Sequence, residues 1–360
     1  MVDLIDERVL ISSPRSSKAV AVWLLIGVGM ITIQVLLGGI TRLTESGLSI
    51  TEWKPLTGIL PPLNQLDWQI EFDKYKHTEQ YYYIHSDFSI NDFKFIFFWE
   101  WFHRLWARLL GVVFLVGFFY FLATKQFRKN MILQLSILFL LGALQGVIGW
   151  IMVKSGLIPE RIFVGHLQLT THFIAAMILL CYTFWVALTL LIPKEKYVIN
   201  RSLKNLSLAI LFLISIQLVY GAFMAGLKAA TAAPTWPDIN GSMIPSFQNG
   251  FSPWYKNLIY NKITVQFIHR TIAYILAMLI LQWSLKANKI KFGELLLKSK
   301  WLPVFLVFIQ VLLGILTVIR SPYGQELVYF GVAHQFVGIC LLMSVIWMLF
   351  LVRTARGTSN

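Results

Sequence analysis

Residues 206–227, LSLAILFLISIQLVYGAFMAGL, form an apolar block without a single charged side chain. At about 1.5 Å of rise per residue, a helix of this length crosses the roughly 30 Å of hydrocarbon in a bilayer. Seven more long apolar blocks occupy 20–40, 95–123, 131–153, 163–192, 263–285, 302–319 and 328–352. Because backbone groups find no water inside a bilayer, each block is predicted to be a helix. The sequence therefore predicts an all-α polytopic membrane protein with eight transmembrane helices.

Composition excludes other classes of protein. Hydrophobic residues make up 57% of the 360 residues and charged residues 13%, whereas soluble domains carry about 25% charged residues. The two cysteines, Cys181 and Cys340, each lie inside an apolar block, so neither a disulfide framework nor a Cys-rich metal site is expected. The first block follows a polar leader without a small-residue cleavage site, and we expect it to be retained.

Charge placement predicts the topology. The two tails and the second, fourth and sixth loops together hold 17 basic and five acidic residues, and the other four loops hold 11 of each. The positive-inside rule then places both termini in the cytoplasm. The net charge of +14 thus reflects topology, and no nucleic-acid partner is expected. Two long outer connections, 41–94 and 228–262, are rich in Trp, Pro and Gly, and loops of this length are usually functional.

The pattern Gln-x-x-x-Gly recurs near the outer end of every odd-numbered span. Its four copies are Gln34…Gly38, Gln145…Gly149, Gln217…Gly221 and Gln310…Gly314. A glycine four residues from a polar side chain permits close helix contact and interhelical hydrogen bonding. Four copies at one depth indicate a duplicated four-helix unit, and hence two parallel-repeat four-helix bundles.

Four histidines keep the same register in the even-numbered spans. His103 and His269 are 166 residues apart, and His172 and His334 are 162 residues apart. Each lies about 9–13 Å inside the outer boundary at the helical rise. Ionisable residues in a membrane are costly and usually mark function. A neutral imidazole that bonds to a neighbouring helix is the alternative, and it suits one histidine better than four.

Two imidazoles per half restrict the ligand. Zinc would require three or four ligands, with Cys or carboxylates nearby, and copper would be accompanied by Met or Cys. A haem iron ligated on both faces by histidine needs two ligands per four-helix unit. We therefore expect one haem in each half, with all four histidines as metal ligands.

Arg104 and Arg270 directly follow His103 and His269. Their guanidinium groups suit the propionates of haem, because they form paired hydrogen bonds with carboxylates. The alternative is that both side chains extend to lipid headgroups.

Glu100 lies three residues before His103, on the same helical face, whereas the second half has Gln266 at this place. A carboxylate inside an apolar block is a candidate proton acceptor. An ion pair with Arg104, four residues on, is the alternative. The Glu/Gln difference suggests that one half carries out chemistry and the other carries electrons.

Three further histidines are interpreted differently. His166 precedes His172 by six residues and cannot face the same site, so we expect a role in access or hydrogen bonding. His77 and His85 lie in the polar first outer loop and are expected to be solvated.

Together these residues resemble the heme A synthase family, in its branch shared by mitochondria and many Gram-negative bacteria, from about residue 20 to 350. The strongest match is the first outer segment: Gly38-Gly39-Ile40-Thr41-Arg42-Leu43-Thr44, Ser46-Gly47-Leu48-Ser49-Ile50, Glu52-Trp53, Pro55, Gly58, Leu60-Pro61-Pro62, Trp68, Glu71-Phe72 and Tyr75-Lys76. Glu100-x-x-His103-Arg104, the segment from Gln145 to Leu157, and Gln266-Phe267-Ile268-His269-Arg270 add to it.

The resemblance implies an oxidoreductase that converts the C8 methyl group of haem O to the formyl group of haem A, with oxygen derived from water. It implies that residues 20–192 hold haem O between His103 and His172. Residues 206–352 would hold a haem b between His269 and His334. The remaining parts are a cytoplasmic tail (1–19), a cytoplasmic linker (193–205) and a second tail (353–360).

The resemblance also implies a catalytic role and partners. The family's essential carboxylate corresponds to Glu100. A haem O synthase would supply the substrate, haem A would go to cytochrome c oxidase assembly, and a quinone or another acceptor would take the electrons. The expected location is the lipid of the bacterial inner membrane, with the haem sites towards the outer face, and a homo-oligomer is compatible with the sequence.

The sequence departs from the family in three places. A cysteine pair of one bacterial branch is missing from the outer loops, and residues 233–238 differ from the pattern common elsewhere. The match at His172 rests only on residues 166–173. Two other functions remain open at this stage: a di-haem b electron carrier resembling a quinol oxidoreductase, and a haem transporter or chaperone.

Overall fold

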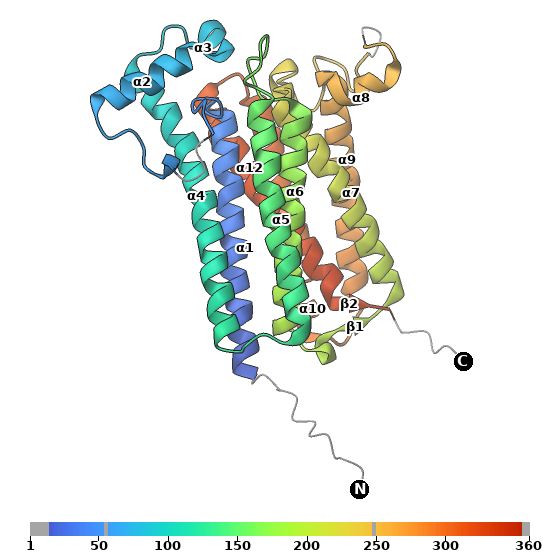
Figure 1. The fold of residues 1–360 in the computed structure, drawn as a ribbon. Coiled ribbons are helices and arrows are strands. Elements are labelled where there is room, and N and C mark those ends of the chain that lie inside the picture. The colour runs from blue at the N-terminus through green and yellow to red at the C-terminus, as the bar shows by residue number, and fades with distance from the viewer. Residues whose placement is uncertain (1–13, 54–56, 247–249, 355–360) are drawn as a thin grey trace.

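The computed structural model describes residues 14–53, 57–246 and 250–354, and the predicted tails (1–19 and 353–360) fall largely outside this range, as does Pro55. Eight of its helices are long and apolar enough to cross a membrane. They are α1 (Pro14–Leu43), α4 (Ile90–Ala123), α5 (Lys129–Lys154), α6 (His166–Leu191), α7 (Arg201–Gly226), α9 (Lys262–Ala287), α11 (Leu302–Ile319) and α12 (Gly324–Leu351). The prediction of an all-α protein with eight membrane-spanning helices is confirmed (Figure 1).

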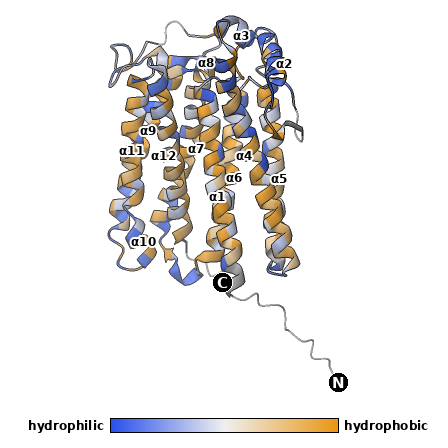
Figure 2. Cartoon of the chain, turned by 90° about the vertical axis from the view of Figure 1, so that its left-hand side faces the viewer, coloured by the Kyte–Doolittle hydropathy of each residue, from blue (hydrophilic) through white to orange (hydrophobic). Residues whose placement is uncertain are grey.

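Most helices extend a few residues beyond the predicted spans because polar caps start them outside the apolar blocks. Ser89 and Asp92 form a reciprocal capping box at the start of α4. Asn261 accepts hydrogen bonds from the backbone at the start of α9. Figure 2 shows the result: apolar residues dominate the middle of the helices, and hydrophilic residues gather towards their ends.

The spanning helices pack in two groups. In the first group, α1 packs against α4 and α6, and α5 packs against α6. In the second, α7 packs against α9 and α12, and α11 packs against α9 and α12. Contacts of α6 with α7 and of α1 with α12 join the groups. This grouping has the composition expected of two four-helix bundles, while their relation as a repeat stays a prediction.

The apolar core lies at the centre of the molecule and towards the end that carries the linker. Its largest fully buried side chains include Leu180, Ile280, Trp283 and Phe350. The indole nitrogen of Trp283 donates to the hydroxyl of Ser207, 2.9 Å away, so this buried polar group is satisfied. The core thus holds α6, α7, α9 and α12 together below the histidines.

Short elements complete the connections. The outer side carries η1 (Thr57–Ile59), α2 (Gln65–Lys76), α3 (Glu79–Ile84), η3 (Ala229–Ala232), η4 (Trp254–Lys256) and α8 (Asn257–Tyr260). The opposite side carries η2 (Lys194–Lys196), α10 (Glu294–Ser299) and a parallel pair of two-residue strands, β1 (Val198–Ile199) and β2 (Val352–Arg353). The strand pair ties the linker between the halves to the end of the last span.

The first outer connection is an ordered structure with an apolar core of its own. Phe72 and Tyr75 of α2 are buried against Phe93, Ile96 and Phe97 of α4. The aromatic rings of Phe72 and Phe93 stack with centroids 5.0 Å apart. These contacts fix the outer connection over the end of α4 that carries the predicted site residues.

Candidate functional site

The structure places the four predicted haem ligands on the even-numbered spans, as expected. His103 lies on α4, His172 on α6, His269 on α9 and His334 on α12. Each group of helices therefore contains two of the four imidazoles. Each imidazole also faces one Gln-x-x-x-Gly motif of a neighbouring helix.

The glycine of each motif makes room for a histidine ring. A methyl group added at Gly149 would lie 2.8 Å from Cε1 of His172, and one at Gly314 would lie 3.0 Å from Cε1 of His334. The corresponding distances are 3.3 Å from Gly38 to Nε2 of His103 and 3.3 Å from Gly221 to Cε1 of His269. Because real side-chain carbons rarely approach so closely, all four positions favour glycine for the same reason.

The glutamine of each motif contacts the same histidine as the glycine. The Nε2 of Gln145 donates to the backbone oxygen of His172 at 2.9 Å and lies 3.2 Å from its Nδ1. Gln34 donates to the backbone oxygen of His103 at 3.2 Å. In the second half, Gln217 and Gln310 place Nε2 3.4 Å and 3.2 Å from the Nε2 of His269 and His334.

The remaining polar atoms of these glutamines are unsatisfied. The Oε1 of Gln34, Gln145, Gln217 and Gln310 is buried in each case and has no hydrogen-bond partner among the described residues. Buried polar atoms without partners cost free energy and usually mark a functional position. Four such atoms beside four histidines indicate polar sites that a ligand would complete.

The two imidazoles of the second half lie close together. The ring centroids of His269 and His334 are 6.4 Å apart, with an interplanar angle of 68°. Imidazole nitrogens bind first-row metal ions at about 2 Å, and the ring nitrogen lies about 1 Å in front of the ring centre. The separation of the rings therefore suits two imidazoles on one metal ion, and in this structure the Nε2 atom of each ring lies beside a glutamine.

The set of donors suits haem better than a bare metal ion. The described part of the chain contains no group of three or more His, Cys, Asp or Glu side chains that could hold a metal ion. A porphyrin supplies four ligands itself and requires only two axial ones. The residues present therefore fit a haem iron.

Glu100 is 3% exposed and its carboxylate is fully engaged. Its Oε1 lies 2.6 Å from Nη2 of Arg104, so the ion pair expected as an alternative is present. Its Oε2 accepts hydrogen bonds from the hydroxyl of Ser49 at 2.8 Å and from the backbone N–H of Ile50 at 2.9 Å. The carboxylate thus joins α4 to the first outer connection, and its catalytic role stays a prediction.

Arg104 and Arg270 both hold an outer connection through its backbone carbonyls. Arg104 donates to the oxygen of Ile50 at 3.0 Å. Arg270 donates to the oxygens of Thr235 and Asp238 at 2.7 Å and 2.8 Å. Propionate binding by these two arginines stays a prediction.

Gln266 and Glu100 occupy corresponding places in the two halves but form different hydrogen bonds. Gln266 is fully buried and donates through Nε2 to the oxygen of Ala233 at 2.9 Å. Glu100 instead accepts from its loop. Both side chains anchor an outer connection, but only Glu100 brings a group that can take up a proton.

The remaining histidines test the minor predictions. His77 is exposed, as expected, but the expectation for His85 is wrong, because this side chain is buried at 6% exposure. His85 stacks on Phe88 and its Nδ1 lies 2.6 Å from the hydroxyl of Tyr75. His166 begins α6 and lies against the ring of Tyr260, which places it at the junction with the second half.

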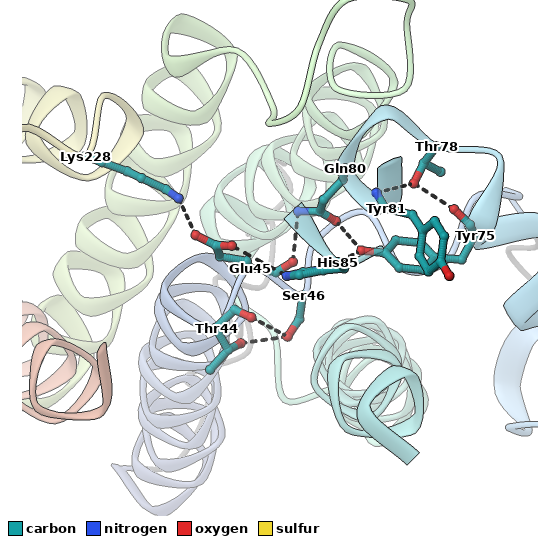
Figure 3. Close-up of polar contacts among 9 residues, drawn as sticks. All are labelled: Thr44, Glu45, Ser46, Tyr75, Thr78, Gln80, Tyr81, His85 and Lys228. Atoms are coloured by element: carbon teal, nitrogen blue, oxygen red, sulfur yellow. Dashed lines mark hydrogen bonds and ion pairs between the residues drawn. The ribbon is translucent and has the colours of Figure 1, made fainter. Parts of the chain in front are cut away.

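A polar contact that the sequence did not predict joins the two halves at the outer face (Figure 3). Glu45, which follows α1, forms an ion pair with Lys228, which follows α7. The Nε2 of His85 lies 3.7 Å from the other carboxylate oxygen. We call Glu45, His85 and Lys228 the outer clasp. The hydrogen bond between Glu45 and His85, and then the ion pair between Glu45 and Lys228, lower the pKa of Glu45 to about 2, although burial of Glu45 opposes this shift.

Comparison with known proteins identifies the family. The family described as "Cytochrome oxidase assembly protein" (COX15-CtaA) matches residues 21–346. The chain is 40% identical to "Heme A synthase" of Flavobacterium psychrophilum over 93% of this chain and 98% of that protein. It is also 40% identical to "Heme A synthase" of Flavobacterium johnsoniae, with the same coverage, and to that of Nitrosospira multiformis over 92% of each chain. The chain therefore belongs to the cytochrome oxidase assembly protein family COX15-CtaA.

Proposed function

We propose that this protein is a haem A synthase, an oxidoreductase that converts the C8 methyl group of haem O to the formyl group of haem A. The observation that carries this proposal is the set of four histidines, each faced by a Gln-x-x-x-Gly motif, in a chain that is 40% identical to heme A synthases over nearly its full length. The eight apolar helices also suit this proposal, because an apolar haem dissolves in the membrane that they would span.

The reaction balances with water as the source of oxygen. A methyl group and one water give a formyl group, four protons and four electrons, in two steps through a hydroxymethyl group. The acceptor of the electrons is a quinone or another membrane oxidant. The protons require a base close to the reacting carbon.

The proposed roles follow the two groups of helices. His103 and His172 would hold the substrate haem O in the half formed by residues 20–192. His269 and His334 would hold a haem b in the half formed by residues 206–352, where it would supply a one-electron redox centre.

Glu100 is the proposed base. It is the carboxylate nearest in sequence to His103, and it is buried at 3% exposure. Arg104 and Ser49 fix the two carboxylate oxygens. These contacts hold the carboxylate in one orientation, and its contact with Arg104 would weaken when it takes up a proton.

The proposed setting follows from this activity. Haem O would come from a haem O synthase, and haem A would leave for the assembly of cytochrome c oxidase. The protein would lie in the bacterial inner membrane with both termini in the cytoplasm. The site residues, which lie near the opposite ends of the spans, would then face outwards.

Co-expression with a haem O synthase tests the proposal, with haems extracted from the membranes and separated by chromatography. We expect haem A to appear only when this chain is present. Membranes that contain haem O and no haem A would overturn the proposal. Two haem b groups in the purified chain under those conditions would instead identify a di-haem electron carrier.

A further inference from the structure

An apolar cavity lies within the first group of helices, directly beneath the first pair of histidines. Its volume is about 270 Å³. An apolar cavity of about 150 Å³ binds benzene, so this space holds a considerably larger apolar group. The lining residues come from α1, α4, α5 and α6, and include Gly27, Gly111, Phe114, Phe139, Gly142 and Leu179.

The cavity lies on the side of the histidines away from the outer face. On α4, Gly111 follows His103 by eight residues, which is roughly 12 Å along the helix. On α5, which runs in the opposite direction, Gly142 precedes Gln145 by three residues. The cavity thus begins about one helical turn below the layer of glutamines and histidines.

The polar groups in the lining are already satisfied. The hydroxyl of Thr183 donates to the backbone oxygen of Leu179 at 2.7 Å. The indole nitrogen of Trp23 donates to the backbone oxygen of Val113 at 3.2 Å. The other side chains in the lining are aliphatic, aromatic or Met30, apart from the glycines. Such a lining selects a hydrocarbon occupant, because a polar one would lose its hydrogen bonds to water.

The cavity lies where the first group of helices is least closed. In the second group, α9 packs closely against α11. In the first group, α4 and α5 are not among the closely packed pairs of the described chain. The aromatic rings of Phe114 on α4 and Phe139 on α5 do contact each other, with centroids 6.3 Å apart. Accordingly, only 6% of the residues in the most apolar 18-residue stretch of α4 are buried inside the protein. This is the lowest share among the eight described spans. The stretch of α4 beside the cavity is therefore largely uncovered by other helices, and lipid would reach it in a membrane.

Two glycines keep the cavity wide. Side-chain carbons added at Gly111 of α4 or Gly142 of α5 would meet no atom within 4 Å. Neither glycine is therefore required for close helix packing, unlike Gly149, which lies about two turns from Gly142 on α5. Both line the cavity, Gly111 half-buried and Gly142 exposed, so a larger side chain at either position has open space in front of it.

We propose that this cavity holds the isoprenoid chain of the substrate haem, and that the chain reaches it through the opening between α4 and α5. This inference rests on the proposed function. Haem O differs from haem b by a long apolar chain on a pyrrole ring that carries no propionate. With the propionates towards the outer face, this chain points towards the cavity. The cavity would then distinguish haem O from haem b, which has no such chain.

Filling the cavity tests the proposal. The variants Gly111→Leu and Gly142→Leu place a branched side chain in the empty space, and leucine is a better helix former than glycine. Gly146→Leu is the matched control: it also lies on α5 and meets no atom within 4 Å, but it does not line the cavity. Purified full-length protein is titrated with haem O and, separately, with haem b, and binding is followed by Soret absorbance.

We expect Gly142→Leu and Gly111→Leu to weaken haem O binding about tenfold or more while haem b binding stays at the wild-type value. Gly146→Leu should bind both haems as the wild type does. An equal loss for both haems, or no loss for haem O, would overturn the proposal. A change confined to co-purifying lipid would also overturn it, since the cavity would then hold an acyl chain.

The co-expression experiment tests the proposed function separately from the proposal about the isoprenoid chain. If wild-type protein forms haem A in the co-expression experiment while the cavity variants bind haem O normally, only the proposal about the chain fails. If wild-type protein forms no haem A, the proposed function fails whatever the variants bind.

Discussion

Gly149 of α5 lies directly against the imidazole of His172 on α6, so that a methyl group in its place would lie 2.8 Å from the ring carbon Cε1. The same motif places Gln145 beside the ring nitrogen Nδ1 of this histidine, 3.2 Å away. One helical turn of α5 thus determines both the position and the polar surroundings of a proposed haem ligand. The motifs of Gln217 and Gln310 do the same for His269 and His334, whereas Gln34 bonds only to the backbone oxygen of His103.

The first prediction concerns this contact. Gly149→Ala should displace the ring of His172 and weaken haem O binding about tenfold or more, because backbone and ring cannot both keep their places. Gly146→Ala, on the same helix, meets no atom within 4 Å and should leave binding unchanged. Titration with haem O measures both. Equal behaviour of the two variants would show that the glycine at 149 does not position the histidine.

The second prediction concerns the proposed base. Glu100→Gln keeps the shape of the side chain and reproduces the residue that the second half has at Gln266. We expect haem A formation to fall by about 10²-fold to 10⁴-fold, the usual contribution of a general base. Haems extracted from membranes that also contain a haem O synthase give the measurement.

Haem content provides the control for this variant. Haem b in the purified protein should stay at the wild-type level, because its proposed ligands lie in the other half. Ser49→Ala removes one hydrogen bond to the carboxylate but leaves the base, so its effect should be much smaller. Undiminished haem A in Glu100→Gln would refute the assignment of the base.

The third prediction concerns the outer clasp and pH. The pKa of Glu45 is lowered to about 2 from an ordinary 4.5, first by its hydrogen bond with His85 and then by Lys228. A lowered carboxyl pKa gives stability that is fully present above the ordinary value and is lost as the pH falls towards 2. Detergent-solubilised protein should therefore unfold at a lower temperature at about pH 3 than at about pH 6.

Two variants separate the clasp from other acid-labile groups. Glu45→Gln should lower the unfolding temperature at about pH 6 and should reduce its decrease towards about pH 3. Asp87→Asn changes an exposed carboxylate of the first outer connection and should leave the wild-type pH profile nearly intact. An unchanged profile in Glu45→Gln would mean that the clasp does not stabilise the contact between the halves.

The spans could be predicted from the sequence to within a few residues because the length of an apolar block is set by the bilayer. The close approach at Gln-x-x-x-Gly was also predictable, but its partner was not. Spacing along one helix says nothing about the rotation of its neighbour, so the contact of Gly38 with His103 required the structure.

The outer connections could be predicted least well. His85 lies in a polar segment, yet the aromatic core of that segment buries it beside Phe88 and Tyr75. Glu45 and Lys228 are 183 residues apart, and no local pattern links them. Their offset equals that between Gln34 and Gln217, so the ion pair joins positions that correspond in the two halves. The sparse packing between α4 and α5 likewise depends on contacts between helices, which no local pattern gives.

The most direct test of the account is the absorption spectrum of the purified full-length protein and of two histidine variants. We expect the wild type to show the Soret band of a low-spin haem ligated by two histidines. The band of haem b should disappear in His334→Ala and persist in His172→Ala. A wild-type protein without Soret absorbance, or a His334→Ala spectrum identical to that of the wild type, would contradict the central claim that paired imidazoles hold a haem in this chain.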